Sequence, residues 1–156
     1  MKQMNKVLLG ALTGCVLALS QPAAASAEFG TAAEAEAMVK KAIDHMKKAG
    51  RESAYADFTA KKPPFFDRDL YVTVTSLQGP SMAHGQNPKM VGMNLTDFKD
   101  VDGKLYFRER FELAKSKGKF WQDFKFVDPV TKKILPKSMY CELETDVIVC
   151  TGIYKR

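Results

Sequence analysis

Hydrophobic positions in the N-terminal part of the chain recur at helical spacing. Met38, Ala42 and Met46 lie four residues apart, while charged residues such as Lys40 and Asp44 lie mostly on the other side. This spacing is typical of a helix with one buried face. Residues 31–34, Thr-Ala-Ala-Glu, form a capping box, in which the hydroxyl and the carboxylate each satisfy a main-chain N–H at the helix start. The pattern predicts a long helix that begins there and that Gly50 ends or kinks.

A second helical stretch precedes the change to strands and turns. This stretch, Glu52 to Thr59, ends before a pair of prolines, which restrict the chain to extended geometry. From Phe65 onward β-branched and aromatic residues dominate. Asp69 to Leu77 therefore predicts a strand, and Ser81 to His84 predicts a short strand that returns beside it.

Further along, one more helix precedes three strands. Residues 105–118 carry aromatic and aliphatic positions on one side of a helical pattern, and Gly118 closes it as a C-cap. Residues 119–127 predict a third strand, and residues 137–144 and 147–154 predict a final antiparallel pair.

The register of the final pair follows from its turn. A tight turn centred between residues 145 and 146 sets Cys141 opposite Cys150, within reach of a cross-strand disulfide. The same register pairs Leu143 with Ile148 and Met139 with Gly152.

The predicted helices, gathered on an antiparallel sheet of the predicted strands, indicate an α+β domain.

The extreme N-terminus has the features of an export signal. Lys2 and Lys6 precede an apolar run from Val7 to Leu19, and the small residues 25–27 suit signal peptidase. The run is too short for a finished membrane span. We expect cleavage after Ala27, a signal peptide of residues 1–27, a single domain of residues 28–156, and a periplasmic or secreted protein.

A lipid anchor is the alternative for the same segment. Residues 12–15, Leu-Thr-Gly-Cys, resemble a bacterial lipobox, which would place a lipid on Cys15. The apolar run before Cys15 is very short, however, and the residues after it stay apolar instead of forming a polar tether. Free export is therefore the preferred interpretation.

Charge and cysteine content restrict the classes of partner. The formal net charge is +6 and falls to +4 without Lys2 and Lys6, and the remaining basic residues are mixed with acidic ones. This mixture is typical of a solvated surface and excludes a nucleic-acid stripe. Beyond Cys15, Cys141 and Cys150 remain, an even number that favours a disulfide in an oxidising compartment. Two buried thiols are the alternative.

A family resemblance rests on several segments in a fixed order. These are AMVKKAIDHMKKAG, FFDRDLYVTV, GPSMAHGQNPKMVGMNL, DVDGKLYFRERFELAKSKG, DPVTKKILPKSMYCE and VIVCTGIYK. The order resembles the single Cache domain (type 2), a PAS-like extracellular sensor module of bacteria. The resemblance implies a five-stranded antiparallel sheet with a long N-terminal helix and a helix-loop insertion between strands 2 and 3. The chain lacks the flanking membrane helices and signalling module of such sensors, so we expect a stand-alone exported form.

The resemblance also implies a small pocket for a short carboxylate such as acetate, propionate, pyruvate or lactate. His84 ends a strand on the pocket side, and its imidazole can donate to a carboxylate. Lys137 starts a later strand with an ammonium group, while Tyr140 and Tyr71 offer hydroxyl groups on apolar bodies. Ordinary turn, surface and core roles are the alternatives for these residues.

The rest of the pocket is less defined by sequence. Met93, Phe107 and Trp121 are candidates for an apolar wall, with core packing as the alternative. Arg108 and Arg110 carry the best carboxylate partner, a guanidinium. Because glutamates flank them, they are interpreted as residues of a solvated helix face.

Other functions have weaker signals. With His45 and His84 as its only histidines and no Gly-x-Ser-x-Gly motif, the chain offers little for nucleophilic catalysis, so we expect no enzyme. No ligand spacing predicts a metal or another cofactor. An interaction subunit that docks on a membrane-bound sensor, and a homodimer formed through the N-terminal helix, stay open as alternatives.

Overall fold

The computed structural model describes residues 28–156. The predicted signal peptide, residues 1–27, and the alternative lipid site at Cys15 lie outside the described residues. Helix α1 (Ala32–Ala49) starts with the predicted capping box. The Thr31 N–H donates to the Glu34 carboxylate at 2.8 Å, and the Glu34 N–H donates to Thr31 Oγ1 at 3.3 Å.

The second helix and the strands follow the predicted order. Gly50 has a φ of 81°, a left-handed value that suits glycine, and separates α1 from the next helix. The remaining elements are α2 (Arg51–Thr59), β1 (Phe66–Asp67), β2 (Leu70–Tyr71), β3 (Thr73–Ser76), β4 (Ser81–His84), the 3-10 helix η1 (Pro88–Met90), α3 (Tyr106–Lys117), β5 (Lys119–Val127), β6 (Ile134–Glu144) and β7 (Val147–Tyr154).

The predicted fold class is confirmed. Strands β4, β3, β7, β6 and β5 form, in that spatial order, a five-stranded antiparallel sheet, while β1 and β2 pair separately. The helix-loop insertion lies between β4 and β5, which are the second and third strands of the sheet along the chain.

The register of the last two strands also agrees with the prediction. Cys141 of β6 pairs with Cys150 of β7. Leu143 pairs with Ile148, and Met139 pairs with Gly152. The predicted disulfide between Cys141 and Cys150 is present, and both cysteines are buried.

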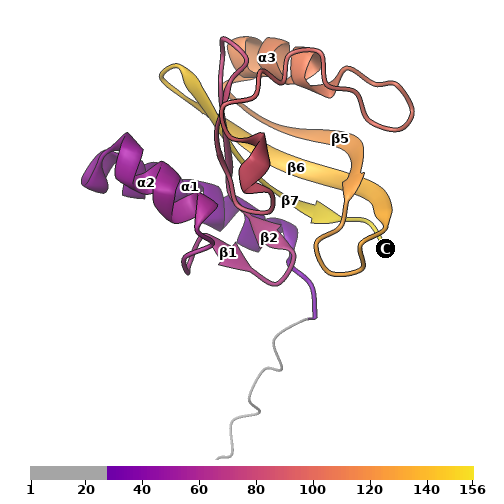
Figure 1. Ribbon diagram of the computed structural model, residues 1–156, viewed down its shortest axis with the longest axis horizontal. Helices are drawn as coiled ribbons and strands as arrows, with labels where there is room; N and C mark the ends of the chain where they lie inside the picture. The colour runs from indigo at the N-terminus through magenta and orange to yellow at the C-terminus, as the bar shows by residue number, and fades with distance from the viewer. Residues whose placement is uncertain (1–27) are drawn as a thin grey trace, which may run out of the picture.

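The two faces of the sheet carry separate cores. Helices α1 and α2 cover one face, and α3 with the loop before it covers the other (Figure 1). The α1 face buries mostly aliphatic residues such as Val39, Val74 and Val149, whereas the α3 face buries many aromatic rings. Within residues 28–156, no helix is both long and apolar enough to cross a membrane.

Candidate ligand-binding site

A small cavity lies on the α3 face of the sheet. Strands β2 to β6, helix α3 and the loop that contains η1 all contribute to its lining. The space open to the centre of a water molecule is about 20 Å³. The lining is largely aromatic, and its polar side chains are unusual because two of them are basic and buried.

Lys137 supplies the first buried cation. It lies on β6 between Phe124 of β5 and Tyr154 of β7, which are its partners in the register, and its exposed fraction is 1%. Its Nζ donates to the hydroxyl oxygens of Tyr71 at 2.7 Å and Tyr154 at 3.3 Å. It also lies 3.9 Å from the centroid of the Tyr71 ring. Burial and the nearby charge of Arg110 hold the pKa of Lys137 well below its usual value.

Gly152 provides the room for this lysine. It faces Met139 across the β6–β7 pair. A Cβ atom at position 152 would lie 2.9 Å from Lys137 Cε and 2.8 Å from Met139 Cα. A larger residue would therefore push on both the main chain and the lysine stem.

Arg110 supplies the second buried cation. It lies on α3 with an exposed fraction of 2%, and its guanidinium carbon is 4.6 Å from the centroid of Phe107 and 5.3 Å from that of Phe124. Among residues 28–156, no partner bonds to its Nη2. Burial lowers the pKa of Arg110 to about 10.

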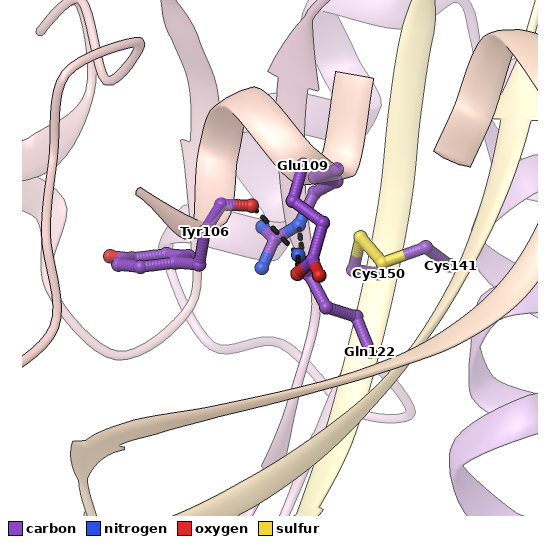
Figure 2. Close-up of a disulfide and its surroundings, with 6 residues drawn as sticks. Tyr106, Glu109, Gln122, Cys141 and Cys150 are labelled. Atoms are coloured by element: carbon purple, nitrogen blue, oxygen red, sulfur yellow. Dashed lines mark hydrogen bonds between the residues drawn. A yellow bond between two sulfur atoms is a disulfide. The ribbon is translucent and has the colours of Figure 1, made fainter. Parts of the chain in front are cut away.

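A neutral amide holds Arg110 in place. Arg110 Nε donates to Gln122 Oε1 at 3.0 Å. Figure 2 shows the amide of Gln122 reaching the main-chain oxygen of Tyr106 and the carboxylate of Glu109, at 2.8 and 2.6 Å. Because Gln122 is uncharged, it fixes the guanidinium without neutralising it.

His84 is held as a neutral donor. Its Nδ1 accepts the main-chain N–H groups of Gln86 at 3.3 Å and Asn87 at 3.1 Å, so its proton resides on Nε2. Burial, with the charges of Lys137 and Arg110, lowers the pKa of His84 to about 3. The turn that follows His84 therefore contributes to the site directly, because its main-chain N–H groups fix the tautomer of the His84 imidazole.

Two buried carboxylates lie near the cavity but already have a partner. Asp69 and Asp128 each accept a hydrogen bond from the Arg156 guanidinium at 2.9 Å. The Arg156 guanidinium also stacks on Phe29, 3.5 Å from its ring centroid. No ion pair joins a carboxylate to Lys137 or Arg110 within the described part of the chain.

Four residues that the sequence proposed for the site line this cavity. They are Tyr71, His84, Phe107 and Lys137. The rings of Tyr71 and His84 stack with centroids 5.6 Å apart, which brings β2 and β4 together at the pocket.

The other three proposed residues lie elsewhere. Trp121 and Tyr140 pair across β5 and β6 and pack on the α1 side of the sheet. Their neighbours in sequence, such as Phe120 and Met139, face the α3 side, because strand side chains alternate between faces. Met93 lies in the loop after η1 with 42% of its surface exposed, and Met90 from the same loop lines the cavity instead.

The assignment of Arg110 to a solvated helix face was wrong, because its side chain is buried and lines the cavity. A helical projection could have found this residue, because position 110 lies three or four residues from Phe107, Tyr106 and Ala114, on the buried stripe. Arg108 lies on the exposed side and pairs with Asp97 at 2.5 Å. The threonine hydroxyls at positions 73 and 75 in the lining, and Gln122 behind Arg110, had no sequence signal of their own.

Comparison with known proteins identifies a family. The family model described as Single Cache domain 2 matches residues 2–156. The match includes the leading segment that the structure does not describe.

Solved structures with the same fold come from chemotaxis proteins. A methyl-accepting chemotaxis protein from Vibrio parahaemolyticus RIMD 2210633 aligns with a TM-score of 0.67 and 23% identity, over 78% of this chain and 86% of that chain. A periplasmic sensor domain of a chemotaxis protein aligns with a TM-score of 0.62 and 20% identity, over 78% and 88%. A Cache chemosensory domain solved for carboxylic acid recognition aligns with a TM-score of 0.68 and 21% identity, over 80% and 92%.

Proposed function

The chain belongs to the single Cache domain 2 family, and we propose that it is an exported, non-catalytic sensor-type domain that binds a short carboxylate such as acetate, propionate, pyruvate or lactate. A neighbour of the same fold is a Cache domain that recognises carboxylic acids. The ligand class proposed for this chain rests on that likeness together with the residues of its own cavity.

The observation that carries the proposal is the pair of buried cations. Lys137 and Arg110 line one cavity, each with an exposed fraction of 2% or less. Taking a charge out of water is costly unless an opposite charge or hydrogen bonds compensate it. Within residues 28–156 no carboxylate forms an ion pair with either basic group, so an anionic ligand would supply the missing compensation.

The remaining polar groups favour a ligand rich in acceptor oxygens. The His84 Nε2–H, the free N–H groups of Arg110 and the third N–H of a charged Lys137 are all donors. A carboxylate offers acceptors only, and charge-assisted hydrogen bonds to it are the strong ones.

The size of the cavity favours a ligand of two or three carbons. The volume open to the centre of a water molecule is about 20 Å³, which is enough for one or two water molecules. The rings of Phe107 and Phe124 line this space and suit a short apolar tail. A longer chain would have to displace packed aromatic rings.

A binding role fits the chemistry better than catalysis. His84 is the histidine of the lining, its Nδ1 is occupied by two main-chain N–H groups, and its ring bonds to no hydroxyl group. Nucleophilic catalysis needs a nucleophile hydrogen-bonded to a base, and His84 forms no such pair with any lining residue that the structure describes.

A thermal-shift titration with the sodium salts of the four acids tests the proposal. A ligand that binds only the folded chain adds about 2.7 kcal/mol of stability at a concentration of 100 times its Kd. We expect a rise in Tm with at least one acid, and its loss in Arg110→Met. The matched control is Arg108→Met, two residues away on the exposed side of the same helix. Absence of any shift with all four acids would contradict the proposed function.

Export is a separate part of the proposal. Intact mass measurement of the exported protein should show that residues 1–27 are missing. Retention in the membrane fraction that is lost in Cys15→Ser would instead support the lipid anchor. Recovery of the whole chain in the cytoplasm would contradict both.

Assembly stays a prediction as well. Helix α1 turns its apolar side toward the chain's own sheet, and its exposed side carries charged residues such as Lys40, Asp44 and Lys48. A homodimer through α1 would therefore use a polar surface. Light scattering after gel filtration, with and without propionate, measures the oligomeric state.

Docking on a membrane-bound sensor is the companion prediction, and co-purification from detergent-solubilised membranes tests it.

A further inference from the structure

We propose that the pocket takes up a proton with each anion, because Lys137 is an uncharged amine when the pocket is empty and an ammonium ion when the carboxylate is bound. This inference rests on the proposed function, since it concerns how the same cavity binds its anion. It adds a second bound species, a proton from the solvent.

The first argument is the presence of two basic groups in one buried cavity. Arg110 keeps its charge under nearly all conditions in proteins, whereas a lysine readily loses its proton when buried. With no anion present, the two positive charges repel one another without the screening of water. Lys137 is the group that can relieve this repulsion, by releasing its proton.

The surroundings of Lys137 support the uncharged form. Its neighbours on β2, β4 and β7 are neutral, and α3 presents a cation. These groups are the hydroxyls of Tyr71 and Tyr154, the imidazole of His84 and the guanidinium of Arg110.

Two carboxylates favour the ammonium form, but only through space. Asp69 and Asp128 both have hydrogen bonds to Arg156 at 2.9 Å, so most of their charge is compensated there. The balance of burial, repulsion and attraction holds the pKa of Lys137 well below its usual value.

The hydroxyl network can serve both protonation states without moving a heavy atom. Tyr154 Oη donates to the Val127 carbonyl at 2.7 Å, so its oxygen is free to accept. Tyr71 Oη lies 2.7 Å from Lys137 Nζ and 3.1 Å from Tyr154 Oη. With an uncharged amine, the Tyr71 O–H donates to the lone pair on Nζ. With an ammonium ion, Nζ donates to both hydroxyl oxygens and the Tyr71 O–H turns toward Tyr154.

The proton balance of the step is simple. A carboxylate anion and a proton from solvent enter, the amine of Lys137 becomes an ammonium ion, and no covalent bond other than N–H forms. The charge of the cavity is the same before and after binding, since one anion and one proton enter together. As the pH rises, the proton becomes scarcer and binding should weaken by up to about tenfold per pH unit.

Calorimetry measures this proton uptake directly. The exported chain is titrated with sodium propionate and sodium pyruvate at pH 7.5 in PIPES, HEPES and Tris, which differ in ionisation enthalpy. The slope of observed heat against ionisation enthalpy is the number of protons taken up, and we expect about one per anion. Binding with a slope of zero would overturn the inference and leave the proposed function intact. If none of the four acids binds, neither propionate, pyruvate, acetate nor lactate, both the inference and the proposed function would be overturned.

Three variants identify the group that takes the proton. Lys137→Met should bind more weakly and with a slope near zero, whereas His84→Asn keeps an acceptor for the turn and should still show uptake. Lys40→Met, an exposed lysine on α1, is the matched control for removal of a lysine and should behave like the parent chain. If Lys137→Met no longer binds, the decision rests on His84→Asn: a slope near zero in that variant would assign the proton to the histidine and overturn the inference.

Discussion

On the α1 face of the sheet, the buried carboxylate of Glu142 has a basic partner, while on the α3 face two buried basic groups have no acidic partner among the described residues. Glu142 accepts a hydrogen bond from Tyr140 at 2.8 Å and pairs with Lys119 at 2.9 Å. Across the sheet, Lys137 and Arg110 have only uncharged hydrogen-bond partners among the described residues. The same strands thus carry a satisfied core on one side and an electrostatically incomplete one on the other.

This difference separates a structural face from a binding face. A paired buried charge is a feature of folding, because its desolvation is offset within the chain. An unpaired buried charge destabilises the empty protein and is retained where a ligand completes it. Changes on the α1 face should therefore alter stability without altering affinity, whereas changes on the α3 face should alter affinity.

The largest effect is expected from Phe58→Ala on the α1 side. Phe58 of α2 is fully buried and packs edge-on against Phe65. Removing such a ring leaves a cavity and should lower the free energy of unfolding by about 3–5 kcal/mol. Urea denaturation measures this loss, while calorimetry with propionate should give an unchanged Kd for the folded fraction. A Kd that rises in step with the lost stability would contradict the separation of the two faces.

Acid should destabilise the α3 face through His84. The pKa of His84 is about 3 in the folded chain, against an ordinary value of 6.5. Between these values the unfolded chain binds a proton that the native chain does not, so stability falls as the pH is lowered. The contribution is fully present above pH 6.5, and about 3 kcal/mol of it should be lost by pH 4. Urea denaturation at pH 7, 5 and 4 measures it, and His84→Asn should lose less stability than the parent over the same range.

The Gln122 amide should affect affinity more than stability. In Gln122→Met, Arg110 loses the acceptor at 3.0 Å that orients it. Glu109 loses the amide donor at 2.6 Å and can turn to the guanidinium and neutralise it. We expect the Kd for propionate to rise about tenfold, in the range of one hydrogen bond to a charged group. An unchanged Kd, with Tm also unchanged, would show that Arg110 needs no positioning residue.

Sequence reasoning predicted the elements and the register, because both follow from local rules. Helical spacing and one capping box located the first helix, and a turn centre was enough to pair Cys141 with Cys150. The helix-loop insertion was also predicted from residues that end helices, such as Gly118.

The residues of the site were harder to predict, because the face of the helix or strand on which a side chain lies matters more than its neighbours along the chain. Arg110 was judged by the glutamates beside it, although its neighbours in space are three and four residues away on α3. Tyr140 was grouped with Lys137, but their odd separation along β6 places them on opposite faces. Sequence could not show that the turn fixes the tautomer of His84, since that depends on the folded positions of two main-chain N–H groups.

The smallest expected effect comes from Tyr140→Phe, and it tests the assignment of faces most directly. The variant removes the hydrogen bond from Tyr140 to Glu142, while Lys119 still compensates that carboxylate. A single hydrogen bond of this kind contributes about 1 kcal/mol to stability, so urea denaturation should show a loss of that order. Because the ring lies behind the sheet as seen from the cavity, calorimetry with propionate should give the same Kd and the same proton uptake as the parent. A clear loss of affinity would return Tyr140 to the binding site, and the α1 face would then not be purely structural.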